Sequence, residues 1–358
     1  DISRRLQYRR RTEEEKEGIH WGQRKLLLSE IEFLTIYWDP MTIDNPLCVY
    51  AGAAPGTHIP ILSMLFPSIT FHLYDPRAFG IKATDKIVIY QEYFTEEVAA
   101  RYANRSDIFF ISDIRTASYN NIELEKFAKF GITRFDKVGN PIGDKQLIKD
   151  ARASAQITNE DQIWGDMSMQ QNWVLIMNPE HAFLKFRLPY ALDGKDKVVQ
   201  YLKGAVYWQM WPPQTSTETR LKPVRNESGV YEVENWSILE YEEWCFYHNV
   251  IDRERVTYIN PFTGAVNPID APELLNDYDS TAEAYVLKLF YEKFGSTDIY
   301  SDVVTLSRYL TQYITSKQTI KHTLSKLRVS PTRSAGKRAA DAYRVKQGLQ
   351  PQKKESYR

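Results

Sequence analysis

The chain has 358 residues, of which 43% are hydrophobic and 13% aromatic, enough for one large domain with a sizeable core. Basic and acidic side chains both number 46, so the net charge of zero favours no class of partner. The two cysteines, Cys48 and Cys245, cannot form a disulfide framework, which indicates a reducing compartment. Neither an apolar run of about 18 residues nor an apolar leader is visible, so we expect no membrane span and no secretion signal.

The first half of the chain alternates between helical and strand-like segments. Apolar residues at helical spacing predict helices, and short β-branched and aromatic runs predict strands. In chain order we expect a helix at 21–37, a strand at 47–51, a helix at 58–66, strands at 70–74 and 86–90, a helix at 95–103, and strands at 107–111 and 173–177. This alternation favours a parallel, doubly wound sheet covered by helices.

The second half divides by composition. Residues 205–211 and 217–223 are compatible with further, antiparallel strands, and 282–294 and 303–314 read as helices. We therefore predict an α/β fold with a Rossmann-like, doubly wound, mostly parallel sheet and a helical C-terminal extension. The expected parts are a charged segment at 1–20, a main domain at 21–275 with an insertion at 116–171, the helical extension at 276–329, and a basic, disordered tail at 330–358.

A glycine-rich turn after the first expected strand has the pattern of a nucleotide-type cofactor loop. Residues 52–56 read Gly-Ala-Ala-Pro-Gly, and glycine lets the backbone approach a ligand. The turn is neither Gly-x-Gly-x-x-Gly nor a phosphate loop with a following Lys-Ser/Thr, which argues against dinucleotides and nucleoside triphosphates. Asp75 ends the next strand and is placed to accept ribose hydroxyls. The alternative is a plain tight turn with a surface Asp.

Four segments together resemble one viral family. They are Gly-Gln-Arg-Lys-Leu-Leu-Leu at 22–28, Tyr-Ala-Gly-Ala-Ala-Pro-Gly-Thr-His at 50–58, Ile-Ser-Asp-Ile-Arg at 111–115 and Leu-Lys-Phe-Arg at 184–187. In this order they resemble the poxvirus cap-specific mRNA nucleoside 2′-O-methyltransferases, which are also small stimulatory subunits of poly(A) polymerase. The resemblance covers about residues 22–242. It implies a methyltransferase of a large DNA virus that uses S-adenosylmethionine and releases S-adenosylhomocysteine.

The resemblance also implies a set of site residues. The family's catalytic tetrad falls on Lys25, Asp113, Lys185 and Glu218. Glu218 is assigned because Ser-Thr-Glu-Thr-Arg-Leu at 216–221 is similar to the family's Ser-Ala-Glu-Met-Arg-Leu. Cofactor contacts are expected from Gln23, Gly52, Ala54, Gly56, His58, Asp75, Arg77, Phe94 and Asp113, and no metal is expected.

These residue types suit methyl transfer to a hydroxyl. A ribose 2′-hydroxyl is a weak acid and must lose its proton as it attacks the methyl group of a sulfonium. Lys185 is the expected general base, in a neutral state that desolvation or a second cation favours. Lys25 would lower its pKa and stabilise the developing alkoxide, while Asp113 and Glu218 orient the lysines. A lone lysine on a helix is usually solvated, so the hypothesis rests on the combination.

Recognition of the cap requires aromatic rings, because N7-methylguanine is positively charged and binds by stacking and cation–π attraction. The resemblance implies Tyr190 as one stacking ring, Glu242 as the purine-reading acid, and Tyr8 as a candidate second ring. Arg115 and Arg187 are candidates for RNA phosphates. The basic tail is a further candidate, with 12 Lys or Arg between 317 and 358. The alternatives are a surface tyrosine, a solvated acidic run and a solubilising arm.

Expected partners are capped mRNA and a poly(A) polymerase or another transcription or capping subunit, in the host cytoplasm or the virion. Three other functions remain open. The first is a 2′-O-methyltransferase for uncapped RNA. The second is an amino-group methyltransferase, because Asn-Pro-Glu-His at 178–181 faintly resembles Asn-Pro-Pro-Tyr but lacks its second Pro and aromatic residue. The third is a non-catalytic RNA-binding or polymerase-processivity subunit on a methyltransferase fold.

Overall fold

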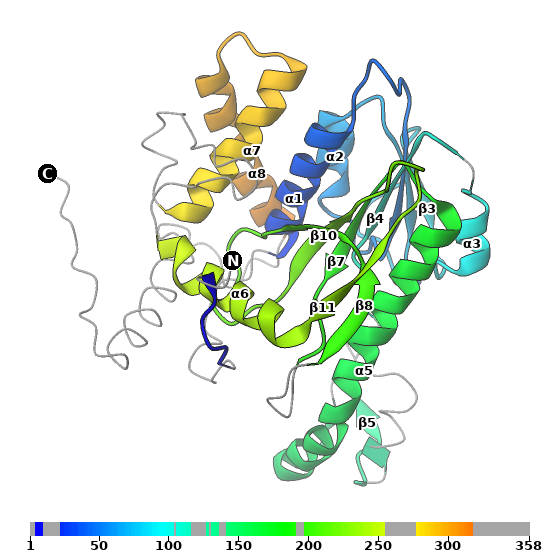
Figure 1. The fold of residues 1–358 in the computed structure, drawn as a ribbon, viewed down its shortest axis with the longest axis vertical. Coiled ribbons are helices and arrows are strands. Elements are labelled where there is room, and N and C mark those ends of the chain that lie inside the picture. Colours follow the sequence, from blue (N-terminus) through cyan, green and yellow to red (C-terminus); the bar gives the residue numbers. More distant parts are fainter. Residues whose placement is uncertain are drawn as a thin grey trace, which may run out of the picture.

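A seven-stranded sheet forms the centre of the molecule (Figure 1). The computed structural model describes residues 4–9, 22–103, 105–115, 127–128, 130–135, 141–190, 197–254 and 277–317. The strand order is β3-β2-β1-β4-β7-β10-β9, with bounds β1 (Leu47–Ala51), β2 (Thr70–Tyr74), β3 (Ile87–Tyr90), β4 (Ile108–Ser112), β7 (His181–Phe186), β9 (Gly204–Tyr207) and β10 (Thr219–Pro223). Neighbours from β3 to β7 are parallel, and β10 is antiparallel to both β7 and β9. The predicted mostly parallel α/β sheet is confirmed.

Helices cover both faces of this sheet (Figure 1). One face carries α1 (Gly22–Tyr37), α2 (Ile59–Leu65), α7 (Tyr278–Phe294) and α8 (Ile299–Lys317), and the other carries α3 (Glu96–Ala100), α5 (Lys145–Met177) and α6 (Ile238–Val250). Outside the main sheet, β8 (Val198–Leu202) pairs with β11 (Val233–Ser237), and β5 (Arg134–Phe135) pairs with β6 (Pro141–Ile142). None of the described helices is long and apolar enough to cross a membrane.

The side chains of the central strands alternate between two hydrophobic cores. In β1, Leu47, Val49 and Ala51 lie in the core that contains α5, whereas Cys48 and Tyr50 lie in the core that contains α1. Successive side chains of a strand point to opposite faces, so a strand covered on both faces must be apolar along its whole length. This burial explains the unbroken apolar run of β1.

The strand predicted at 173–177 is wrong, because these residues form the last turns of the 33-residue helix α5. The helix ends at Asn178, which has a left-handed φ of 44° and donates its backbone N–H to the carbonyl of Val174. Asn in this conformation is a common helix end, and the following Pro179 cannot continue a helix. The fifth strand is β7 instead. Asn-Pro-Glu-His at 178–181 is therefore a helix end that leads into a strand.

The other predicted helices and strands are present, with ends that differ by a few residues. The predictions did not include β5, β6, β7, β8, β11 or α6. The described part of the insertion at 116–171 contains β5, β6 and most of α5, and the end of α5 near β5 projects beyond the main sheet (Figure 1). Residues 1–3, 10–21 and 318–358 lie outside the described residues, and with them most of the charged segment and the tail predicted to be disordered.

A buried ion pair fastens the C-terminal helices to α1. Arg24 donates Nε and Nη2 to the two carboxylate oxygens of Glu283 on α7 at 2.9 and 2.7 Å, and the two side chains are 8% and 4% exposed. Ser307 on α8 donates to the same carboxylate at 2.6 Å, and Arg24 also donates to Thr311 at 2.5 Å. Because Arg24 directly precedes Lys25, this network sets the position of the helix that carries Lys25.

Candidate active site

The strand order reverses at β1, which lies between β2 and β4. In open α/β sheets, ligands bind beyond the carboxyl ends of the strands at such a reversal. Gly52 follows β1 with a φ of 79°, and a Cβ atom added there would lie 2.7 Å from the backbone N of Ile114 and 2.8 Å from the carbonyl carbon of Asp113. Glycine alone allows the loop after β1 to pass this close to the end of β4.

Strand pairing brings Lys185 and Arg220 to the same edge of the sheet. Phe183 of β7 lies in the core that contains α1, and Lys185, two residues later, points to the same face. Arg220 of β10 is opposite Lys185 in the antiparallel register. Both side chains donate to Oδ1 of Asp113, Lys185 Nζ at 2.9 Å and Arg220 Nη2 at 2.7 Å. The carboxylate at the end of β4 therefore joins β4, β7 and β10.

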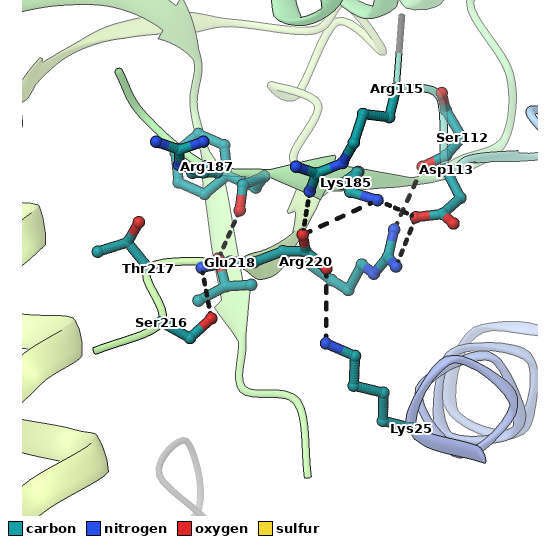
Figure 2. A network of polar contacts seen from close by, with 12 residues as sticks. Lys25, Ser112, Asp113, Arg115, Lys185, Arg187, Ser216, Thr217, Glu218 and Arg220 are labelled. Carbon is teal, nitrogen blue, oxygen red and sulfur yellow. Dashed lines mark hydrogen bonds and ion pairs between the residues drawn. The ribbon is translucent and has the colours of Figure 1, made fainter. Parts of the chain in front are cut away.

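Glu218 and Lys25 complete the cluster (Figure 2). Lys25 reaches in from α1, and its Nζ lies 3.6 Å from Oε1 of Glu218. Nζ of Lys185 lies 3.9 Å from Oε2 of the same carboxylate, which also forms an ion pair with Arg115. The four residues assigned to the tetrad thus lie together, although they come from α1, the end of β4, β7 and the position before β10.

The two carboxyl groups of the cluster remain ionised. Burial alone would raise the pKa of Asp113, but the charges of Arg220 and Lys185 outweigh burial and hold this pKa well below its usual range. Burial has the same effect on Glu218, and there the charges of Lys185, Lys25 and Arg115 lower the pKa to about 2. Both groups can therefore orient cations at neutral pH, and neither can serve as a proton donor.

The cluster carries an excess of positive charge. Two carboxylates, Asp113 and Glu218, face four basic side chains, Lys25, Arg115, Lys185 and Arg220. Burial lowers the pKa of Lys25, and Arg220 and Lys185 lower it further against the opposing charge of Glu218. An arginine keeps its proton in a protein, so only a lysine of this cluster can supply a neutral basic nitrogen.

Arg220 is a site residue that the sequence reasoning missed. Its side chain is almost completely buried, and besides Asp113 it reaches the backbone carbonyl of Ser112 at 3.5 Å. The signal was available, because Arg220 follows Glu218 by two residues in an expected strand, and side chains two apart share one face of a strand.

A chain of hydrogen bonds connects Gln23 to the glycine loop and to the buried Glu30. Oε1 of Gln23 accepts from the hydroxyl of Thr57 at 3.0 Å and lies 2.9 Å from Nδ1 of His58. Nε2 of His58 lies 3.0 Å from a carboxylate oxygen of the buried Glu30, which also accepts from the hydroxyl of Tyr50 at 2.6 Å. His58 is itself buried, so its place is within the core, where it holds Gln23 at the loop.

Asp75 ties the cofactor loop to the end of β2. Its Oδ2 accepts from the backbone N–H of Ala54 at 3.1 Å and from Nη2 of Arg77 at 2.8 Å. Its Oδ1 accepts from the backbone N–H and from Nε of Arg77, both at 2.9 Å. A carboxylate has about four acceptor positions. A ligand hydroxyl could therefore bond to Asp75 only if the guanidinium of Arg77, whose side chain is 63% exposed, moved aside.

Gly56 and Phe94 occupy different environments. Gly56 closes the loop with a φ of 68°, and a Cβ atom there would lie 3.1 Å from the carbonyl oxygen of Ala53. Phe94 is buried and packs edge-to-face against Tyr74 and Trp173 at centroid distances of 5.2 and 4.9 Å. The structure therefore places Gly56 in the loop and Phe94 in the hydrophobic core beneath it.

The two tyrosines assigned to the cap lie against each other. The rings of Tyr8 and Tyr190 are stacked, with centroids 5.5 Å apart and planes 23° apart, and Tyr8 also contacts the edge of Phe246 at 5.8 Å. The hydroxyl of Tyr8 donates to the carbonyl of Thr215 at 3.1 Å. The N-terminal segment is anchored further along α6, where Arg5 pairs with Glu243 at 2.6 Å. Segments far apart in sequence thus form one aromatic pair.

Glu242 and Arg187 lie beside this pair. Glu242 of α6 is buried. The pKa of Tyr8 is raised by its own burial and by the nearby Tyr190 and Glu242, so Tyr8, Tyr190 and Glu242 lie close together. Arg187 lies over the ring of Tyr190 at 4.2 Å and pairs with Glu160 of α5 at 2.9 Å. The structure therefore brings Arg187 to the aromatic pair, while Arg115 lies at the tetrad.

The described residues contain no group of three or more His, Cys, Asp or Glu side chains that could hold a metal ion. The charged side chains at the tetrad are two lysines and two arginines around the carboxylates of Asp113 and Glu218. The chemistry of this donor set is proton transfer and stabilisation of negative charge.

Comparison with known proteins identifies the family. A family model described as poly A polymerase regulatory subunit matches residues 1–126 and 137–315. The chain is 25% identical over 323 residues, 85% of this chain and 80% of the relative, to the cap-specific mRNA (nucleoside-2′-O-)-methyltransferase of Myxoma virus (strain Lausanne). It is also 25% identical over 240 residues, 66% of this chain and 68% of the relative, to the protein of that name from Fowlpox virus (strain NVSL). Because the model spans most of the chain, this protein belongs to the poly(A) polymerase regulatory subunit family, in which its viral relatives are named as mRNA cap methyltransferases.

Proposed function

We propose that this protein is a cap-specific mRNA (nucleoside-2′-O-)-methyltransferase that transfers a methyl group from S-adenosylmethionine to a ribose 2′-hydroxyl. The observation that carries the proposal is the contact of Lys185 with Asp113, with Lys25 and Glu218 beside it, at the carboxyl ends of β4 and β7. This cluster directly adjoins the glycine loop after β1. The names of the poxvirus relatives support the same reaction.

The loop residues fit S-adenosylmethionine. Gly52 and Gly56 adopt the positive φ angles that let this loop turn tightly beside the end of β4, and Gln23 and Asp75 offer polar groups at the same loop. Asp75 would hold the ribose hydroxyls once Arg77 moves aside, while Ala54 keeps its backbone bond to Asp75. The bound cofactor supplies an electrophilic methyl group on a sulfonium. Asp113 lies between this loop and the lysines, so it is the residue common to both halves of the site.

Lys185 is the proposed general base. In its neutral form it would accept the proton of the attacking hydroxyl. Lys25 would remain the nearby cation that stabilises the developing alkoxide. Asp113, Glu218 and Arg220 would fix the directions of the two lysines. Much of the rate should come from the in-line placement of oxygen and methyl group, which a rigid cluster provides.

Methyl transfer to matched RNAs tests this proposal. The protein is incubated with methyl-labelled cofactor and, in separate reactions, with three RNAs of the same sequence. Their 5′ ends are an N7-methylguanosine cap, an unmethylated guanosine cap and a triphosphate. We expect label only in the RNA with the N7-methylguanosine cap, on the ribose of its first transcribed nucleotide. Label on a base would contradict the 2′-hydroxyl as acceptor, and equal labelling of the three RNAs would leave a 2′-O-methyltransferase without cap specificity.

Cap binding is proposed at the aromatic pair of Tyr8 and Tyr190. A flat base between two rings needs them about 7 Å apart, whereas stacked aromatic neighbours lie at about 3.5 Å plane to plane. The rings, at a centroid distance of 5.5 Å, would therefore separate to admit the base. Glu242 would accept hydrogen bonds from the purine edge. The charge on N7-methylguanine adds cation–π attraction to the stacking.

Replacing Tyr190 by alanine should weaken binding of N7-methylguanosine cap analogues by roughly 10- to 100-fold, because one stacking surface is lost. Binding of uncapped RNA should change by less than about threefold, since that binding depends on phosphate contacts. Titration of the variant with a cap dinucleotide and with a 5′-hydroxyl RNA measures both effects. Tyr93, which is 70% exposed, supplies the matched control Tyr93→Ala. An equal loss for both ligands in Tyr190→Ala would disprove the cap assignment.

A second candidate function is stimulation of a poly(A) polymerase. The observation that favours it is the family model, whose description names a regulatory subunit of that enzyme and which matches most of the chain. Binding to a polymerase would not exclude methyl transfer. The complete set of basic and acidic side chains at the tetrad supports a catalytic protein that could carry both activities.

A further inference from the structure

Glu160 of α5 links the insertion to the aromatic pair. Its carboxylate accepts two hydrogen bonds from Nη2 of Arg187, at 2.9 and 3.3 Å, and one from the backbone N–H of Tyr190 at 2.7 Å. The side chains of Arg187 and Glu160 are only 12% and 13% exposed. The guanidinium of Arg187 lies 4.2 Å from the ring centroid of Tyr190. One carboxylate therefore holds both the backbone of Tyr190 and the cation that covers its ring.

Helix α5 can hold Glu160 near Tyr190 because the helix packs against β7. Gln170 of α5 donates to the backbone carbonyl of Lys185 at 3.1 Å, and Glu160 reaches Tyr190. Ten helical residues separate the two contacts on α5 and rise roughly 15 Å. Tyr190 lies five residues beyond Lys185, and β7 ends between them at Phe186. The two hydrogen bonds therefore attach this part of the chain to α5 both at Lys185 of the tetrad and at Tyr190 of the aromatic pair.

The charge of Glu160 matters for a cationic ligand. Arg187 places a permanent positive charge against Tyr190, and a like charge close by opposes binding of a second cation. Glu160 lies on Arg187 in a partly buried place, where solvent screens charges less than it does at an open surface. With the pair intact, the positive charge of Arg187 is offset by the carboxylate of Glu160.

We propose that Glu160 is a specificity-determining, positioning residue for the cap: by neutralising Arg187 it lets the Tyr190 ring bind a positively charged N7-methylguanine in preference to neutral guanine. The inference rests on the proposed function, since it assumes a cap at Tyr190. It assigns to the α5 insertion a role in discrimination between methylated and unmethylated caps. The role proposed for Glu160 concerns cap binding and does not involve the proton transfer proposed for Lys185.

The test compares binding of two dinucleotides, N7-methylated and unmethylated GpppG, to variants of the full chain. Glu160→Gln keeps an oxygen for the N–H of Tyr190 but removes the charge. We expect affinity for the methylated dinucleotide to fall about tenfold, while affinity for the unmethylated one changes by less than about threefold. The double variant Glu160→Gln/Arg187→Gln removes the uncompensated cation and should restore the preference. Glu180→Gln, which breaks the 3.0 Å pair with Arg225 at the other end of β7, is the matched control.

Thermal unfolding and S-adenosylhomocysteine binding show whether each variant is folded. A purely structural role would weaken both dinucleotides equally, and removal of Arg187 would not restore the preference; this result overturns the inference. A wild-type preference for the methylated form that persists in Glu160→Gln also overturns it and leaves the proposed function intact. Equal wild-type affinity for both forms overturns the cap assignment itself and the inference with it.

Discussion

Replacing Lys185 by alanine is expected to lower methyl transfer to capped RNA by about 10²- to 10⁴-fold, the range typical for loss of a general base. Nζ of Lys185 lies 2.9 Å from Asp113 and 3.9 Å from Glu218. No other lysine in the described part of the chain is as close to both carboxylates. Binding of S-adenosylhomocysteine should be retained, because the loop at Gly52 does not depend on the lysine. Single-turnover methyl transfer at saturating cofactor measures the loss, and calorimetric titration measures cofactor binding.

Arginine variants separate the two lysines. Lys185→Arg keeps the positive charge but cannot release its proton, so it should be as inactive as Lys185→Ala. Lys25→Arg also keeps its charge and should retain measurable activity if Lys25 acts only as a cation. This control is needed because burial lowers the pKa of Lys25, which makes Lys25 an alternative general base. Activity in Lys185→Arg together with complete loss in Lys25→Arg would move the general base to Lys25.

Replacing Glu283 by alanine is expected to lower the free energy of unfolding by about 3–5 kcal/mol, because it leaves the charge of Arg24 buried without its carboxylate. The pair is almost fully shielded from water, and Ser307 loses its acceptor in the same variant. Urea denaturation at constant pH measures the loss. Methyl transfer should also fall, since the residue after Arg24 is Lys25.

The same helix offers a matched control. Glu292 of α7 pairs with Lys288 at 3.2 Å, but its side chain is 43% exposed. Exposed pairs of this kind contribute less than about 1 kcal/mol, so Glu292→Ala should have little effect on unfolding. Equal losses in Glu283→Ala and Glu292→Ala would show that the Arg24 network does not hold α1 to the C-terminal helices.

Local sequence signals were sufficient for the first four strands of the central sheet, β1 to β4. Strands β1, β2 and β4 are buried on both faces, and such strands must be apolar throughout, which a short window of sequence reveals. The glycine loop was equally readable, because Gly52 and Gly56 occupy positive φ angles that other residues rarely adopt. The parallel, doubly wound class of the sheet followed from the alternation of helices and strands.

Short apolar runs were ambiguous. Residues 173–177 are as apolar as a buried strand, yet they end a helix that is buried on one side by the sheet, and composition cannot separate the two cases. The pair β8 and β11 was missed because its half-exposed strands mix polar and apolar residues. For α6, the acidic run around Glu242 looked solvated, although Glu242 is buried in the structure.

The sequence by itself determined the parallel class of the sheet, the glycine loop after β1 and, through resemblance to a family, which four residues to consider as a tetrad. Only the tertiary structure decided that Lys25, Asp113, Lys185 and Glu218 meet, because strand register and the packing of α1 bring together positions that lie up to 193 residues apart along the chain (25 to 218). It also added Arg220 and Glu160. Their roles depend on burial and on neighbouring charges, and both are properties of packed side chains that no local stretch of sequence contains.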